Sequence, residues 1–114
     1  MSKKIHDFND IIRKLRKEFF GKGPERIHTV FVQNMPISTL YSNLTSTEQF
    51  IARTPEGKKM VHRARTKLIQ NLYASSPPEG FEDLLGAKLH YLFSDIKVDE
   101  DIAVSVFVFE TNIQ

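Results

Sequence analysis

The side chains best suited to chemistry in this chain fall into a basic group and an acidic group. The basic group lies between residues 58 and 65, and the acidic group lies between residues 95 and 101. A cluster of cations can bind an anion or an acidic partner, and a cluster of carboxylates can bind a basic one. The sequence therefore predicts a surface for a protein partner or a small anion, made up of Lys58, Lys59, Arg63, Arg65, His90, Asp95 and Asp99.

Metal binding and thiol chemistry find little support in the sequence. The chain has no cysteine, which excludes disulfides, thiolate zinc sites, iron–sulfur clusters and cysteine nucleophiles. Its four histidines form no His-x-x-x-His or comparable ligand pair. His28 and His90 both fall on expected strands and would meet only if those strands paired. We expect no metal and no cofactor.

The sequence also contains no recognisable nucleotide-binding or catalytic motif. Gly21-Lys22-Gly23 precedes an expected strand, whereas a dinucleotide-binding loop follows one, and Arg26 stands where the third glycine would be. The acidic stretch lacks the glycine and the glutamate of an EF-hand. Ser94-Asp95 has no histidine at a readable spacing. We therefore expect no catalytic residues.

Composition predicts one α+β domain that spans residues 1–114, with an ordered core of about 5–110. The 114 residues are 40% hydrophobic and 26% charged, as in ordinary globular proteins. No apolar run reaches the ~20 residues that span a bilayer, and no signal peptide is recognisable, so we expect a cytoplasmic protein. Residues 1–67 carry 14 Lys and Arg against 6 Asp and Glu, whereas residues 68–114 carry 2 against 8. This asymmetry favours charge pairing within the fold or between subunits.

Helical patterns are strongest in two stretches that carry most of the basic side chains. Residues 5–20 have apolar side chains three or four apart, and Gly21 is placed to end that helix. Thr54 and Pro55 mark the start of a long helix that runs to Tyr73. Its expected apolar stripe, which would pack in the core, is Val61, Ala64, Leu68 and Leu72 with Met60 and Ile69 beside it.

Shorter elements complete the expected order α-β-β-α-α-(α)-β-β. Thr45 and Glu48 form a capping box before a short helix to Arg53, and residues 81–85 form a further turn or two closed by Gly86. Residues 74–80 are a break. The strand patterns predict a four-stranded, mainly antiparallel sheet covered by helices in two layers, with strands at 27–32, 36–41, 89–93 and 102–109.

The last strand carries apolar side chains on both faces. Val104, Val106 and Val108 alternate with Ser105, Phe107 and Phe109. A single helical layer buries only one face of a sheet, so the second face needs another cover. We therefore expect a homodimer that shares sheet or helix faces between subunits.

The order of these segments resembles the MpsC family. The resemblance covers residues 5–110 and rests on Gly21-Lys22-Gly23-Pro24-Glu25, Leu44-Thr45 to Glu48, Thr54-Pro55-Glu56-Gly57, the Arg-rich helix, Leu84-Leu85-Gly86-Ala87-Lys88, Leu92-Phe93-Ser94-Asp95 and Val106-Phe107-Val108-Phe109-Glu110. That family comprises small bacterial proteins named for an Na⁺-translocating system that generates a membrane potential. The resemblance implies an accessory or regulatory protein, with a possible membrane-associated partner linked to ion movement and inorganic-carbon supply.

Two other classes of function remain open at this point. The basic helices could bind nucleic acid, but the absence of a recognisable nucleic-acid-binding motif disfavours this partner. An unrecognised enzyme could act on a small anion in a pocket near Arg65, His90 and Asp95. The favoured interpretation is a non-enzymatic accessory protein.

Overall fold

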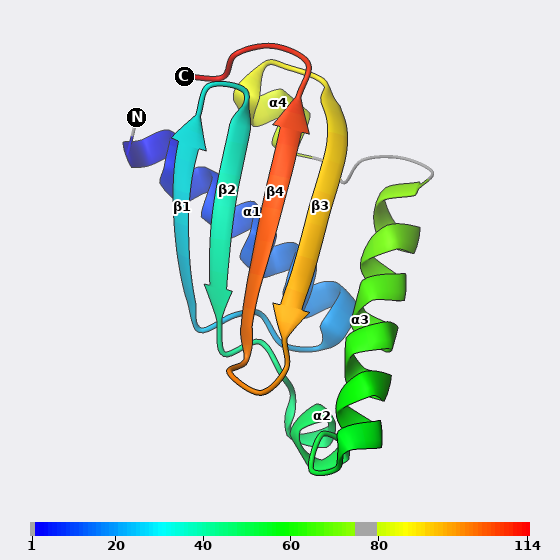
Figure 1. The fold of residues 1–114 in the computed structure, drawn as a ribbon. Coiled ribbons are helices and arrows are strands. Elements are labelled where there is room, and N and C mark those ends of the chain that lie inside the picture. The colour runs from blue at the N-terminus through cyan, green and yellow to red at the C-terminus, as the bar shows by residue number, and fades with distance from the viewer. Residues whose placement is uncertain (1, 75–79) are drawn as a thin grey trace.

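The expected order and type of the elements are confirmed. In the computed structural model, which describes residues 2–74 and 80–114, the chain is an α+β domain (Figure 1). Its elements are α1 (Ser2–Phe20), β1 (Arg26–Val32), β2 (Met35–Tyr41), α2 (Ser46–Ile51), α3 (Pro55–Ala74), α4 (Phe81–Leu85), β3 (Leu89–Lys97) and β4 (Ile102–Phe109). Residues 75–79 of the expected break lie outside the described residues.

The four strands form one antiparallel sheet in the order β1-β2-β4-β3. The β1–β2 hairpin turns at Gln33, which has φ of 57°. The order leaves β1 and β3 as the two edge strands. His28 on β1 and His90 on β3 therefore lie at opposite edges, and the expectation that they could meet is wrong.

Strand β3 is longer than the sequence pattern indicated. It continues beyond residue 93 to Lys97, because Ile96 pairs with Ala103 of β4 and is buried in the core. Asp95 and Lys97 alternate with Ile96 and are exposed. Asp95 thus belongs to a strand and not to the acidic loop in which the pattern placed it.

The predicted capping signals of α2 and α3 are confirmed. Thr45 and Glu48 form both hydrogen bonds of the capping box. Thr54 Oγ1 accepts from the Gly57 amide at 3.0 Å. A Cβ added at Gly57 would lie 1.6 Å from the carbonyl oxygen of Ile51, so this glycine lets the first turn of α3 approach the end of α2 closely.

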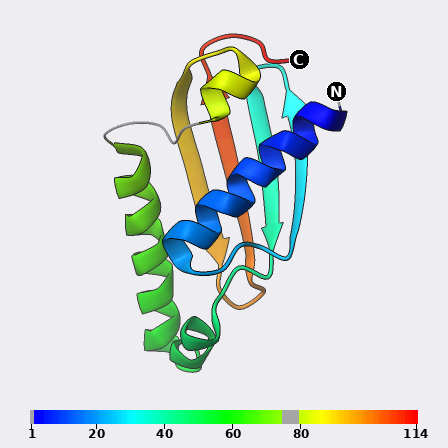
Figure 2. The ribbon, with the colours of Figure 1, turned by 180° about the vertical axis from the view of Figure 1, so that it is seen from behind.

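Helix α1 crosses one face of the sheet, with α4 beside it at one end (Figure 2). The core forms under these helices around Phe8, whose ring centroid lies 4.9 Å from that of Phe81 and 5.0 Å from that of Phe107. Phe31 contacts the same ring edge-on at 5.7 Å. The opposite face of the sheet has no helix in front of it among the described elements (Figure 1).

A row of hydroxyl groups crosses the covered face of the sheet. Thr29 and Ser38 are hydrogen-bonded at 2.7 Å between β1 and β2, and Ser94 and Ser105 at 2.9 Å between β3 and β4. Arg16 of α1 reaches this row through its Nη2, which donates to the Ser105 hydroxyl at 3.3 Å. These hydrogen bonds satisfy the polar side chains that α1 shields from water.

Helix α3 lies beside β3, past the edge of the sheet (Figures 1 and 2). Val61 is buried as expected, but Ala64 is exposed and Met60 is 57% exposed. The expected apolar stripe is therefore wrong at these two positions. The buried position one residue after Ala64 is occupied by Arg65.

The β3–β4 turn is joined to the loop between β2 and α2 by the side chain of Asp101. Its Oδ1 accepts from the backbone N–H of Asn43 at 2.8 Å, and both of its carboxylate oxygens lie within 3.2 Å of the Leu44 nitrogen. Asp101 has φ of 53°, a left-handed conformation that aspartate tolerates better than most residues.

Replacing Asp101 with alanine should lower the free energy of unfolding by about 2–4 kcal/mol, because two partly buried amides lose an anionic acceptor and alanine is less tolerant of positive φ. Urea denaturation at pH 7 would measure the change. Asp99→Ala, in the same turn but at an exposed ion pair, is the control and should cost less than about 1 kcal/mol. Equal losses for the two variants would contradict the assigned role of Asp101.

Candidate functional site

Arg65 points inward from α3 and forms a two-pronged ion pair with Glu48 of α2. Its Nε donates to Glu48 Oε2 at 2.7 Å, and its Nη2 donates to Glu48 Oε1 at 2.6 Å. The same Nη2 donates to the backbone carbonyl of Asn43 at 2.9 Å. Arg65 is only 4% exposed, so it does not lie on the surface with the other predicted cations.

Glu48 serves two structural roles at once. Its Oε1 accepts from the Thr45 amide to complete the capping box and also accepts from Arg65. Burial raises the pKa of Glu48, but the Arg65 hydrogen bonds, the Thr45 amide and the Arg65 charge together outweigh burial and hold this pKa below its usual value. The carboxylate therefore stays ionised where α2 meets α3.

Phe20, at the end of α1, lies against both buried guanidinium groups. The Arg65 guanidinium carbon is 4.2 Å from the Phe20 ring centroid, and that of Arg16 is 5.5 Å away. Beside them is a cavity of about 10 Å³, the size of one water, also bordered by Ser94 and Asp95. Arg65 Nη1 is buried without a hydrogen-bond partner in the described part of the chain. Arg65 is thus a packing residue at the junction of α1, α2 and α3.

A charged hollow of about 850 Å³ opens between α3 and the turn end of the β3–β4 hairpin. Two contacts cross it: Lys58 Nζ lies 2.7 Å from Asp99 Oδ1, and His62 Nε2 lies 2.7 Å from Asp95 Oδ1. The structure therefore brings Lys58, Asp95 and Asp99 together, and it adds His62, which the sequence analysis did not select. These contacts connect α3 to the hairpin.

The pKa of Asp95 lies below its usual value. The hydrogen bond with His62 is the main cause, and the backbone N–H of Ile96 adds to it at 2.8 Å. Slight burial works in the opposite direction, while the charges of His62 and Lys97 lower the pKa further. Asp95 is thus a carboxylate that is held ionised at the edge of the hollow.

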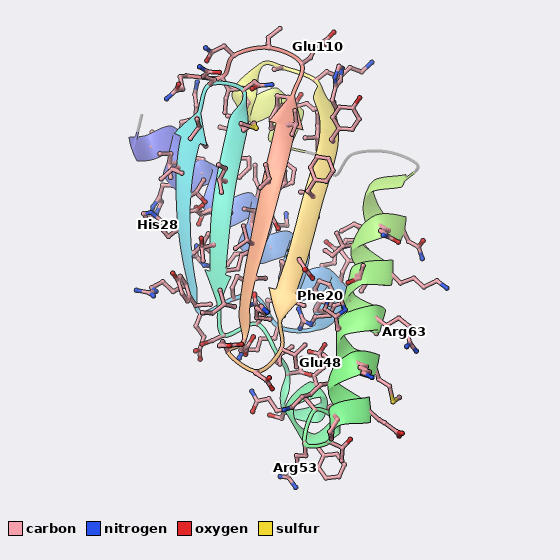
Figure 3. All side chains as sticks on the ribbon, viewed as in Figure 1. Phe20, His28, Glu48, Arg53, Arg63 and Glu110 are labelled. Carbon is pink, nitrogen blue, oxygen red and sulfur yellow. The ribbon has the colours of Figure 1, made fainter. Side chains whose placement is uncertain are left out.

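Three exposed cations follow one another along α3. Lys59, Arg63 and Lys67 border the hollow and are exposed, and none of them has a hydrogen bond or an ion pair within residues 2–74 and 80–114. Arg63 points away from the sheet (Figure 3). We call these three side chains the α3 cation row, because their spacing of four residues places them along one side of the helix.

His90 lies apart from the charged hollow. Its ring contacts Tyr91 edge-on at 5.7 Å, and it borders a second hollow with Phe93 and Val104 on the open sheet face. The pocket proposed for a small-anion enzyme is therefore divided, since Arg65 borders the small internal cavity and His90 does not. No three metal-ligating side chains cluster in the part of the chain that the structure describes.

Comparison with known proteins assigns the chain to a family. Residues 2–111 match the family described as the Na⁺-translocating membrane potential-generating system (MpsC). The chain belongs to the MpsC family. A relative, the uncharacterized protein YrhF of Bacillus subtilis strain 168, is 74% identical over 113 residues, which cover 99% of this chain and 93% of that protein. No solved structure matches.

The family assignment confirms the resemblance but names no reaction. The match spans α1 to the end of β4, so it includes both the Arg65–Glu48 pair and the charged hollow. Among the described residues, no helix combines the length and apolar character needed to cross a bilayer.

Replacing Glu48 with glutamine should lower the free energy of unfolding at pH 7 by about 2–4 kcal/mol, because Arg65 would remain buried without its anion. The Glu48 pKa is lower in the folded state, so its stabilisation is present above the ordinary value of 4.5 and is lost as pH falls through the folded pKa. The difference between wild type and variant should therefore shrink below about pH 4.5. Urea titrations from pH 3 to pH 7 would measure it.

Asp95→Asn is the control for that titration. Asp95 is 79% exposed in its pair with His62, so this change should cost less than about 1 kcal/mol at pH 7. A Glu48→Gln variant as stable as Asp95→Asn would contradict the structural importance of the Arg65–Glu48 pair.

Proposed function

We propose that this chain is a non-enzymatic cytoplasmic accessory protein that binds an acidic protein partner in the membrane system for which its family is named. The α3 cation row is the binding surface. The observation that carries this proposal is that Lys59, Arg63 and Lys67 are exposed on one side of α3 without partners among the described residues.

The cation row contributes nothing evident to the stability of α3. Like charges four residues apart repel one another by a few tenths of a kcal/mol on an isolated helix. Other charged side chains nearby are used within the fold, as Lys58 is by Asp99 and His62 is by Asp95. A row of unpaired cations spanning roughly 12 Å is suited to attract an anionic surface.

Met60 gives the same region an apolar contact. It is 57% exposed and next to Lys59 in the sequence. Methionine adapts its shape to a partner, whereas the neighbouring cations set orientation and speed of association. This combination favours a protein surface over a simple counterion as the partner.

Charge reversal of the cation row should abolish binding to native membranes that contain the family's system. We expect Lys59→Glu, Arg63→Glu and Lys67→Glu together to reduce saturable binding to washed membrane vesicles at least ~10-fold, as judged by co-sedimentation. The matched control reverses Lys14, Lys17 and Lys88, which are exposed elsewhere. Protease-treated vesicles should lose binding, whereas vesicles made from extracted lipid alone should not bind. Equal binding to lipid alone would contradict a protein partner.

A small anion in the charged hollow is the second candidate. The observation in its favour is that Lys58, Lys59, Arg63, Lys67 and Lys97 all border one space of about 850 Å³. An anion that binds only the folded state raises the melting temperature.

Thermal unfolding with bicarbonate, phosphate and simple carboxylates would test this candidate. We expect a saturable rise of several degrees with one anion, lost in the cation-row variant and kept in the control that reverses Lys14, Lys17 and Lys88. Equal shifts in all three proteins would indicate a general salt effect and would exclude the site. A gel shift at 50 mM salt that vanishes at higher salt would instead favour nucleic acid.

A further inference from the structure

The face of the sheet opposite α1 has no described helix in front of it (Figure 1), and the side chains on this face include large apolar ones. The most exposed are Tyr91 at 59%, Phe93 at 61%, Val104 at 42%, Val30 at 41% and Val32 at 43%. Single exposed apolar residues are common on proteins, but a contiguous patch of this kind marks an interface. We call this surface the open face.

Side chains on the open face differ in size between the two edge strands of the sheet. Strand register places Val30, Ile37, Val106 and Phe93 in one row across all four strands. The small valines stand on edge strand β1 and the large aromatic rings on edge strand β3. The neighbouring row contains His28 at the β1 edge and Asp95 at the β3 edge. One edge is therefore complementary to the other in side-chain size.

We propose that a second copy of this chain covers the open face, related by a two-fold axis parallel to the strands. This inference goes beyond the proposed function and does not depend on it. Such an axis places β1 of one copy over β3 of the other, so that Phe93 faces Val30 and Asp95 faces His28. The Phe93 ring of each copy then meets the smaller Val30 of the other, and the same contact occurs twice.

An in-plane axis perpendicular to the strands fits less well. It would place β3 over β3, so that Tyr91 and Phe93 of one copy would meet the same rings of the other. The valines of β1 would then face only valines, and a gap would remain between them. Face-to-face sheets pack about 10 Å apart with small departures from parallel, so an even filling of side chains across the interface matters.

The size of the open face agrees with a dimer that also uses α3. Four strands of about seven residues make a flat area on the order of 400 Å², about half of the ≈800 Å² that a stable interface buries per partner. A hollow of about 620 Å³ continues this face between β3 and α3, where Ile69 and Gln70 form its wall. The two-fold axis brings the exposed β1 edge of the second copy to this hollow. The partner's β1 edge supplies the remaining contact.

Sedimentation of the purified chain tests whether the dimer exists. We expect a dimer at tens of micromolar, and Phe93→Glu should raise the dissociation constant at least ~30-fold, the effect of removing an interface hot spot. Phe50→Glu is the matched control, because Phe50 is 64% exposed on α2, away from this face. Circular dichroism checks that both variants fold. A monomeric wild type, or a dimer unaffected by Phe93→Glu, would overturn the proposal and would leave the face to another protein.

Cysteine cross-linking tests the axis, and the absence of native cysteine makes the chain suitable for it. Val30→Cys and Phe93→Cys are made as separate proteins, mixed, and treated with a bismaleimide of about 10 Å, the separation of packed sheets. We expect a cross-linked dimer from the mixture and little from either protein alone. A cross-link that forms mainly between two Phe93→Cys chains would overturn the assigned axis.

Discussion

The position of α3 depends on the buried pair between Arg65 and Glu48. Helix α3 lies past the sheet edge, and among its described residues only Val61 belongs to the buried apolar core. Arg65 occupies a buried position of the kind that a leucine would fill in an ordinary amphipathic helix. The carboxylate that neutralises it also caps α2. A buried ion pair adds little to the free energy of unfolding when compared with an apolar pair. Removing only one of its two partners, however, is strongly destabilising, because the other charge stays buried without a counter-charge. The α2–α3 geometry is therefore specified by hydrogen bonds with fixed directions.

Polar contacts also connect the other parts of this end of the molecule. Asp101 joins the β3–β4 turn to the loop that contains Asn43, and the backbone carbonyl of Asn43 accepts a hydrogen bond from Arg65. The chain from Asp101 through Asn43 to Arg65 thus links the hairpin to α3. Phe20 completes this junction by covering the guanidinium of Arg65. By contrast, the end of the sheet near α4 is held by a cluster of phenylalanine rings. One end of the domain is packed by apolar contacts and the other by a directional polar network.

This division explains which parts of the fold could be predicted from sequence. Helices α1 and α2 and the strands of the first hairpin carry complete local signals, namely periodic apolar residues, caps and a short turn, and these were identified correctly. Strand β3 was expected to end too early because Asp95 and Lys97 read as loop residues, although only Ile96 between them faces the core. The direction of Arg65 could not be read locally, since its partner lies 17 residues away. Helical periodicity alone places a single arginine on the solvent side of a helix. Of the network that binds Arg65, only the Thr45–Glu48 capping box could be recognised in the sequence.

The two uncovered surfaces of the molecule face in different directions, and this separation has a functional consequence. The open face is apolar, whereas the α3 cation row lies on a different element, and its Arg63 points away from the sheet (Figure 3). In the proposed dimer the two open faces are buried against each other. Each copy keeps its cation row accessible at an outer edge. An axis parallel to the strands leaves the two rows running in the same direction, so both could engage one assembly with repeated acidic sites. Exposed charge pairs are individually weak, but two linked rows bind far more tightly than one when the spacing of the sites matches. A dimer built on the open face would thereby convert a weak electrostatic contact into a selective one.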